Sequence, residues 1–372
     1  MRLFMLLIAV PVLAACSEPQ TETNHRADTV TVEQRMGAVP DPGFARALEP
    51  RVFEFPRDHG AHPGFATEWW YFTGNLQSSD GRRFGYQLTL FRVGLKPGLP
   101  ADDSDWRANQ LYMGHLAISD IAGKRHLSAE RFSRAAVGLA GATTDPLRVW
   151  LGPWSVRGGG SALFPVQLDA SAPGMGISLN LLPTDRPLVL QGDRGLSRKG
   201  EQPGNASYYY SYTRLPTRGE IRVDDRQFEV SGNSWFDREW SSSALAADQA
   251  GWDWLALHLD DGRDLMFYRM RGKDGQAQRF SRGVLVGPDG VVSQLLHNGT
   301  ELDPVRYWTS DQGVRYPVAW NLRAPEQGLD LRIDAAFDAQ EMPLTVRYWE
   351  GAVTVDGSHR GVGYLELSGY DR

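Results

Sequence analysis

Two acidic side chains alternate with tryptophan in one short stretch of the chain. Within residues 234–240, Asp237 and Glu239 follow Trp235 at steps of two residues. On an extended strand, residues two apart face the same way and lie about 6.5–7 Å apart. Two such carboxyls can divide acid and base roles when their surroundings separate their pKa values. Charge balance by Arg238 is the alternative explanation for the same residues.

A third carboxyl, Glu68, lies in the aromatic segment 62–74. If residues 68–73 form a strand, Glu68 and Trp70 share one face, and Trp69 and Tyr71 share the other. Bulky aromatic residues on both faces imply that both sides of the strand are covered. Burial raises the pKa of a carboxyl, so Glu68 is a candidate proton donor or ligand anchor. The alternative is a core strand in which Glu68 pairs with an arginine.

Several kinds of chemistry have no basis in the sequence. It contains no phosphate-binding glycine loop and no G-x-S-x-G nucleophile motif. The spacing of His59 and His62 suits two metal ligands, but no third ligand is fixed, so we expect neither a metal nor an organic cofactor. The formal net charge of −6 gives no reason to expect a nucleic-acid partner.

The single cysteine, Cys16, follows a short apolar run from Leu3 to Leu13. The run is too short to be a permanent membrane helix and is typical of a signal peptide. Its ending resembles a bacterial lipobox, which implies that residues 1–15 are removed and that Cys16 is lipidated. Secretory cleavage with Cys16 as a bystander is the alternative. We expect residues 16–50 to be a flexible tether and the protein to be anchored to the periplasmic side of the bacterial outer membrane.

The rest of the chain reads as β structure, because apolar residues alternate with polar ones between Gly, Asp, Pro and Ser turns. Alternation over residues 220–230, for example, predicts one strand. Residues 69–92 and 252–269 resemble two copies of one hairpin, each with an aromatic strand, an Asp-Gly turn and a second strand. We therefore predict an all-β fold of two lipocalin-like antiparallel barrels, with domains at 51–240 and 241–372.

Longer motifs carry a family resemblance. Residues 62–74, 206–212 and 232–261, together with 348–351 and 361–370, resemble the carotenoid 1,2-hydratase/AttH-like family, including its lipoprotein branch of predicted secreted hydrolases. The resemblance covers nearly all of the chain after residue 45. It implies two lipocalin-like domains and an activity that ranges from hydration of an isoprenoid double bond to lipid handling.

Hydration of an alkene requires a neutral acid, a cation and capture of water, and burial against tryptophan would supply the first of these. On this interpretation Asp237, Glu239 and Asp253 are candidate acids, and aromatic faces stabilise the cation. With Glu68, these residues form the predicted catalytic set. The predicted ligand-binding residues are Trp69, Trp70, Tyr71, Tyr210, Trp235, Trp240, Trp252, Trp254, His258 and Tyr268.

We therefore expect a lipid or isoprenoid ligand in an aromatic cavity near the junction of the two domains, with hydration or hydrolysis as the hypothesised reaction. A non-catalytic periplasmic lipid carrier or chaperone is the first alternative. A carbohydrate-binding protein is the second, and it predicts that Trp69, Trp252 and Trp254 form a row that faces solvent.

Overall fold

Strands make up nearly all of the regular structure. The computed structural model describes residues 42–98, 105–160, 162–243 and 245–370. Within these ranges the helical segments are two short 3-10 turns, η1 (Arg57–His59) and η2 (Pro325–Gln327). No helix in the described ranges is long and apolar enough to cross a membrane. The predicted signal peptide and Cys16 lie outside the described residues.

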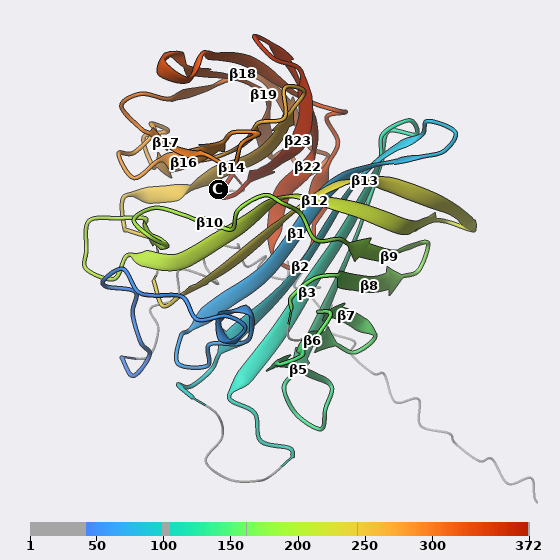
Figure 1. Cartoon of the computed structure of the whole chain (residues 1–372), viewed down its shortest axis with the longest axis vertical. Coiled ribbons are helices and arrows are strands. Elements are labelled where there is room, and N and C mark those ends of the chain that lie inside the picture. The colour runs from blue at the N-terminus through green and yellow to red at the C-terminus, as the bar shows by residue number, and fades with distance from the viewer. Residues whose placement is uncertain (1–41, 99–104, 161, 244, 371–372) are drawn as a thin grey trace, which may run out of the picture.

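The first sheet has 13 strands and forms a nearly closed barrel (Figure 1). Its main path runs β4-β3-β2-β1-β13-β12-β9-β8-β7-β6-β5, and β10 and β11 pair with β12. The strands are β1 (Thr67–Ser78), β2 (Arg83–Gly94), β3 (Gln110–Asp120), β4 (Arg125–Arg134), β5 (Ala140–Thr144), β6 (Leu147–Leu151), β7 (Trp154–Arg157), β8 (Val166–Ala172), β9 (Met175–Leu181), β10 (Val189–Leu190), β11 (Leu196–Arg198), β12 (Ala206–Val223) and β13 (Arg226–Ser241).

The second sheet has 10 strands and forms a half-barrel, drawn in dark yellow to red in Figure 1. Its main path runs β17-β16-β15-β14-β23-β22-β20-β19-β18, and β21 pairs with β22. The strands are β14 (Gln249–Leu259), β15 (Asp264–Gly272), β16 (Arg282–Val286), β17 (Val292–Leu296), β18 (Glu301–Thr309), β19 (Arg315–Ala324), β20 (Leu329–Ala335), β21 (Glu341–Pro343), β22 (Arg347–Gly357) and β23 (Gly361–Leu367). The predicted all-β fold of two lipocalin-like units is confirmed.

Both predicted hairpins are present, and they take equivalent places in the two sheets. In the first, β1 pairs with β2, and in the second, β14 pairs with β15. Gly81 and Gly262 follow the aspartate of each turn with φ angles of +87° and +86°, a region that favours glycine over other residues. The Asp-Gly sequence thus sets each turn where the backbone needs a left-handed residue.

Two boundaries differ from the sequence prediction. Residues 220–230 are not one strand, because β12 ends at Val223 and β13 begins at Arg226, with Asp224 at a positive φ of 56° between them. The folded body also begins before residue 50. Phe44 and Ala47 are buried, and the Ala45 amide donates a hydrogen bond to the Gly64 carbonyl at 2.8 Å. The end of the predicted tether is therefore packed against the first barrel.

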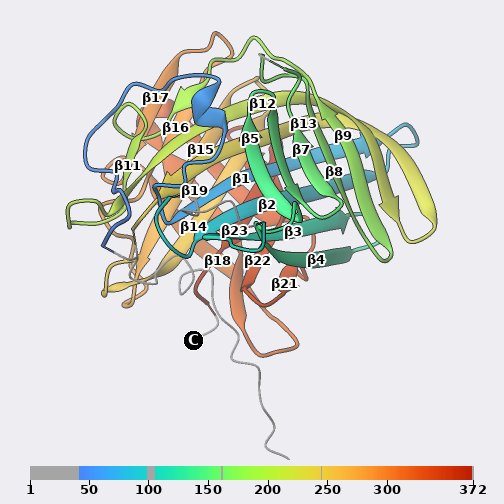
Figure 2. The ribbon, with the colours of Figure 1, turned by 90° about the horizontal axis from the view of Figure 1, so that it is seen from below.

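Apolar side chains fill the inside of each unit, and a further layer lies between the units. Trp70, Phe72 and Phe236 belong to the core of the first barrel, and Leu255 and Phe267 to that of the second. A separate aromatic cluster joins side chains of β1, β12 and β13 to side chains of β14, β15 and β23. Figure 2 shows β1, β2, β14 and β23 lying close together. The space between the two sheets, rather than the inside of a barrel, is therefore available for a site.

Hydrogen bonds between the units fix how the two sheets face each other. The Arg186 guanidinium donates to the carbonyls of Gly287 and Gly262 at 2.5 and 2.6 Å. The Asn75 amide donates to the Gly363 carbonyl at 3.0 Å. These bonds use backbone acceptors, so they set the distance between the sheets without depending on a second side chain.

Candidate functional site

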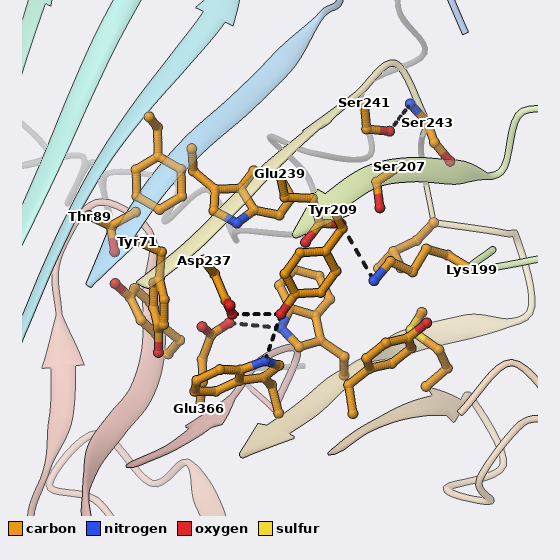
Figure 3. A pocket seen from close by; sticks show the side chains of 18 of the residues that line it. Tyr71, Thr89, Lys199, Ser207, Tyr209, Asp237, Glu239, Ser241, Ser243 and Glu366 are labelled. Atoms are coloured by element: carbon orange, nitrogen blue, oxygen red, sulfur yellow. Dashed lines mark hydrogen bonds and ion pairs between the residues drawn. The ribbon is translucent and has the colours of Figure 1, made fainter. Parts of the chain in front are cut away.

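A cavity of about 120 Å³ lies between the two sheets (Figure 3). It is lined by Trp69, Tyr71, Thr89, Phe91, Lys199, Ser207, Tyr209, Asp237, Glu239, Ser241, Ser243, Leu245, Trp252, Trp254, Tyr268, Met270, Tyr348, Glu350 and Glu366. The walls are thus mainly aromatic, with a few carboxyl and hydroxyl groups among the rings.

Strand register builds the wall that the first sheet contributes. One row of paired residues across β12, β13, β1 and β2 is Tyr209, Glu239, Trp69 and Phe91. The next row on the same face is Ser211, Asp237, Tyr71 and Thr89. Because side chains alternate along a strand, the residues between these rows point into the barrel core. The cavity wall and the barrel core are therefore opposite faces of the same four strands.

The second sheet contributes the facing wall in the same way. A row of paired residues across β22, β23, β14 and β15 is Glu350, Glu366, Trp254 and Tyr268. In Figure 3, Asp237, Tyr209 and Tyr71 point into the space from the first sheet, and Glu366 approaches from the second. The site therefore exists only where both units meet.

Asp237 is the most heavily hydrogen-bonded carboxyl of the cavity wall, and it is 3% exposed. Its Oδ2 accepts from the Tyr209 hydroxyl at 2.6 Å, and its Oδ1 accepts from Ser211 at 2.5 Å and from the Trp235 indole at 2.6 Å. The Trp254 indole donates to the Tyr209 oxygen at 3.2 Å. Burial raises the pKa of Asp237 to about 7, although the three hydrogen bonds favour the charged form. Asp237 can therefore both give and take a proton near neutral pH.

Glu239 lies one row away and faces a cation. The Lys199 ammonium is 3.4 Å from Glu239 Oε1 and 3.9 Å from the centre of the Tyr268 ring. The same ammonium is 5.2 Å from the centre of the Tyr209 ring. Glu239 thus balances Lys199 within the cavity wall, which gives it a different environment from that of Asp237.

Asp253 is a buried ion-pair partner that does not line the cavity. It sits between Trp252 and Trp254 in sequence, so it points to the opposite face of β14 from those two side chains. Its oxygens accept from Arg269 at 3.0 Å and from Arg271 at 2.5 Å. The structure therefore gives Asp253 a charge-pairing position inside the second unit, away from the predicted site.

Glu68 also points away from the cavity, into the core side of β1. It is fully buried and ion-paired with Arg92 and Arg238. Burial alone would raise its pKa, but the two guanidinium groups hold the pKa of Glu68 well below its usual value. The arginine pairing that the sequence left as an alternative is what the structure shows.

The predicted ligand-binding residues divide into two groups. Trp69, Tyr71, Trp252, Trp254 and Tyr268 line the cavity. The others, which do not line it, are Trp70, Tyr210, Trp235, Trp240 and His258.

Each residue of the second group has a specific place. Trp70, Tyr210 and Trp240 pack in the core of the first barrel. Trp235 supports Asp237 through its indole N–H, and His258 Nε2 lies 2.6 Å from the Thr213 carbonyl. Trp70, Tyr210 and Trp240 therefore lie behind the cavity wall, whereas Trp235 and His258 lie beside the cavity, in the layer between the two sheets.

The predicted site residues leave out several polar residues of the cavity, among them Lys199, Tyr209, Glu350 and Glu366. A signal for the two glutamates is present in the sequence. Tyr348 lies two residues before Glu350, and Tyr364 lies two residues before Glu366, each pair on a strand in which apolar residues alternate with polar ones. An acidic residue within such a pattern lies on a covered face and needs an explanation.

The walls do not resemble a metal centre or a sugar platform. No group of three or more His, Cys, Asp or Glu residues within the described ranges is placed to hold a metal ion. Trp69 and Trp252 are half-buried and Trp254 is 6% exposed, and all three line the cavity. A row of tryptophans facing solvent, which the carbohydrate interpretation requires, is not what these residues form.

The comparisons with known proteins agree with this architecture. A crystal structure of an AttH homologue from Nitrosomonas europaea is 34% identical, covers 88% of this chain and 100% of its own, and superposes with a TM-score of 0.78. Kievitone hydratase from Nectria haematococca is 14% identical over 88% of this chain and 97% of its own, with a TM-score of 0.66. CghA is 15% identical over 90% and 98% of the two chains, with a TM-score of 0.51.

The low identities of the last two structures show a shared fold alone. No curated protein sequence matches the chain. A sequence model described as AttH-like matches residues 46–370, which is most of the chain and includes every residue that lines the cavity. The chain therefore belongs to the AttH-like family.

Proposed function

We propose that this protein is a cofactor-free acid/base enzyme that hydrates a carbon–carbon double bond of an apolar lipid or isoprenoid bound between its two sheets. The observation that carries the proposal is Asp237, a buried carboxyl with a pKa near 7 on an aromatic wall. A general acid or base works best when its pKa lies near the operating pH. Hydrolysis of an apolar ligand by the same carboxyl is the neighbouring reaction class.

The reaction needs an acid, a surface that stabilises a cation and a base, and residues of the cavity walls can supply each of them. A carboxylic acid protonates the alkene, the tertiary cation that forms is captured by water, and a carboxylate takes the second proton of that water. Aromatic faces stabilise a cation by about 0.5–2 kcal/mol each, more where water is excluded. Trp69, Trp254 and Tyr268 present rings to the cavity. The sequence of steps consumes one water and leaves the carboxyl as it began.

Structural relatives support a site of this kind in the shared fold. One neighbour is named kievitone hydratase, which makes hydration the first reaction class to test. CghA has been crystallised with Sch210972. These names describe the two relatives themselves. The relatives support the proposal only through the arrangement of two units that they share with this chain.

A non-catalytic lipid carrier is the second candidate, because a cavity with aromatic walls can hold an apolar ligand without reacting. The two functions differ in what happens to the ligand. We would extract the compound that co-purifies with the protein and return it, or its dehydrated form, to fresh protein in water labelled with heavy oxygen. Incorporation of one labelled oxygen is expected for a hydratase, whereas recovery of the unlabelled compound from every incubation would favour the carrier.

We also propose that Cys16 is lipidated and holds the protein at the periplasmic face of the bacterial outer membrane, where an apolar ligand is at hand. The support is the lipobox-like ending before Cys16. Replacing Cys16 with serine is expected to move the protein from the membrane fraction to the soluble fraction, as followed by fractionation of cells. If the variant stayed in the outer membrane, lipidation at Cys16 would not be the anchor.

The Tyr209 hydroxyl offers a test of Asp237 through pH dependence. It donates a hydrogen bond to Asp237, and a donor of this kind stabilises the carboxylate and lowers its pKa. Removing the hydroxyl in Tyr209→Phe is expected to raise the pKa of Asp237 above about 7. The limb of the pH–rate profile that reports Asp237 then moves to higher pH, whether Asp237 acts as the acid or as the base.

A carboxyl titration by NMR provides the same readout without turnover. Ser211→Ala removes another donor to Asp237 and is the matched control, with a shift in the same direction expected. A profile that stayed in place or moved to lower pH in Tyr209→Phe would mean that Asp237 does not control the observed ionisation.

A further inference from the structure

The cavity contains a second pair of carboxyls, Glu350 and Glu366, that the role given to Asp237 does not use. They are direct partners in the register of β22 and β23, and both line the cavity. Side chains at paired positions of an antiparallel sheet have Cβ atoms about 4.5–5.5 Å apart, and like charges there destabilise the sheet. Two carboxyls this close, one of them completely buried, cannot both be ionised without a large cost.

The surroundings of the two carboxyls differ, and the difference decides which one keeps a proton. Glu350 is completely buried, whereas Glu366 is half-buried and accepts a hydrogen bond from the Trp252 indole at 2.7 Å. Partial exposure and an N–H donor stabilise a carboxylate. Burial and the charge of Glu366 raise the pKa of Glu350 well above its usual value.

The groups that face Glu350 from the neighbouring strands supply no compensating positive charge. Tyr71 of β1, Tyr348 of β22, and Tyr364 and Glu366 of β23 surround Glu350, with His115 of β3 hydrogen-bonded to Tyr348 and Asp237 of β13 near Tyr71. Burial lowers the pKa of His115 to about 3, so its imidazole is neutral near pH 7. The tyrosines are neutral as well, because burial raises the pKa of each well above its usual value.

The direct hydrogen bonds of Glu350 involve only one of its two carboxyl oxygens. Oε1 accepts from the Tyr71 hydroxyl at 2.6 Å, across the gap between the two sheets. Oε2 is buried and has no partner at hydrogen-bond geometry among the described residues, although the Tyr348 hydroxyl also interacts with the Glu350 carboxyl. A buried polar oxygen without a partner is costly and needs an explanation. A protonated Oε2 whose O–H donates to a bound ligand provides one.

We propose that Glu350 and Glu366 hold one proton between them at neutral pH, that Glu350 carries it, and that Glu350 Oε2 is the catalytic proton donor to the ligand. This proposal rests on the function proposed above. It assigns one of the two proton transfers of the hydration to each sheet. Glu350 on the second sheet gives the first proton, and Asp237 on the first sheet takes the second.

The atoms balance in this scheme. The O–H bond of Glu350 breaks as its proton bonds to one alkene carbon through the π electron pair, which leaves a cation on the other carbon. A lone pair of water forms the C–O bond, and the proton released from that water passes to the Asp237 carboxylate. Solvent then carries one proton from Asp237 back to Glu350. The net change is one water added to the double bond.

The location of the proton is tested first, without any ligand. Infrared difference spectra would be recorded near pH 7 in an Asp237→Asn background, so that Asp237 adds no signal. The carbonyl-stretch band of a protonated carboxylic acid is expected to disappear in Glu350→Gln and to remain in Glu366→Gln. In Glu366→Gln, loss of the like charge should also move the titration of Glu350 to lower pH. Retention of the band in Glu350→Gln, or its loss only in Glu366→Gln, would overturn the proposal.

The donor role is tested with a bound reporter that needs no turnover. Methyl undecyl ketone with an isotope-labelled carbonyl is the probe, because its C=O stretch moves to lower frequency when the oxygen accepts a hydrogen bond from an acid. We expect this shift for the bound ketone in the unmodified protein and in Glu366→Gln, and its loss in Glu350→Leu. A bound ketone with the same frequency in Glu350→Leu as in the unmodified protein would contradict donation by Glu350.

These readouts separate the failure of this proposal from the failure of the proposed function. Glu350 can be shown to hold and donate its proton even if heavy oxygen never enters the co-purified compound, which would remove the hydratase but keep the acid. Conversely, hydration that survives Glu350→Gln unchanged and is lost in Asp237→Asn would keep the enzyme and remove Glu350 as its donor.

Discussion

Replacing Asp237 with asparagine is expected to slow turnover by about 10²–10⁴-fold, the usual contribution of a general acid or base. Asparagine keeps the size of the side chain, and its amide oxygen can still accept from Ser211 and Trp235. It cannot give or take the proton. The fold should therefore survive while the chemical step is lost, and the rate constant for heavy-oxygen incorporation into the co-purified compound is the measurement.

Glu239→Gln is the matched control for this change. Glu239 lines the same wall, two residues away on β13, but its carboxylate balances Lys199 and accepts none of the three donors that hold Asp237. A rate within about tenfold of the unmodified protein is expected for Glu239→Gln. Equal activity of Asp237→Asn and the unmodified protein would remove Asp237 from the chemistry and leave the carrier as the better account.

Replacing Glu68 with glutamine is expected to lower the free energy of unfolding by about 3–5 kcal/mol, the usual cost of breaking a buried ion pair from one side. The change leaves the guanidinium groups of Arg92 and Arg238 without their charged partner, and these side chains are 1% and 0% exposed. Arg238 also lies 4.0 Å from the centre of the buried Trp70 ring. Urea unfolding at neutral pH measures the effect.

The pH dependence of this loss has a defined sign. The pKa of Glu68 is lower in the folded protein than in the unfolded chain, so its stabilising effect is present above the unfolded value near 4.5 and declines as the pH falls toward the folded value. The difference between Glu68→Gln and the unmodified protein should therefore shrink in acid. Glu229→Gln, an exposed change on β13, is the control and should alter the free energy of unfolding by about 0.5 kcal/mol or less. A similarly small effect for Glu68→Gln would argue against a structural role.

Local pattern was enough to predict the fold class and the strands that carry the site. The two Asp-Gly turns, at Gly81 and Gly262, join the strands of the two hairpins that the sequence predicted. Alternation also predicted that Asp237 and Glu239 share a face, and both line the cavity. These features depend on residues within a few positions of each other, which is the distance over which strand geometry acts.

The same alternation rule, applied more strictly, would have shown that some candidate acids face the opposite side of their strand from the neighbouring candidate tryptophans. Asp253 lies between Trp252 and Trp254, so it cannot share a face with them on one strand. Glu68 and Trp69 are neighbours and must also face opposite ways. Which of the two faces meets the cavity is not a local property, because it depends on how the second unit docks.

The docking of the units is what sequence pattern could not supply. The bond between Tyr71 and Glu350 joins residues 279 positions apart. Glu350 and Glu366 become a coupled pair only because β22 and β23 align them, a register set by the connection from Gly357 to Gly361. Nothing within either strand alone indicates that its glutamate will face another acid.

The cavity wall and the barrel core are opposite faces of the same strands. This arrangement limits which sequence changes can alter the cavity during evolution. Substituting a wall residue of β13, such as Asp237, leaves the core side untouched. Inserting or deleting one residue in the strand would bring core side chains such as Arg238 and Trp240 to the cavity and turn the acids into the barrel. New ligand preferences are therefore accessible by exchanging side chains at fixed strand positions, whereas changes of chain length are tolerable only in the loops.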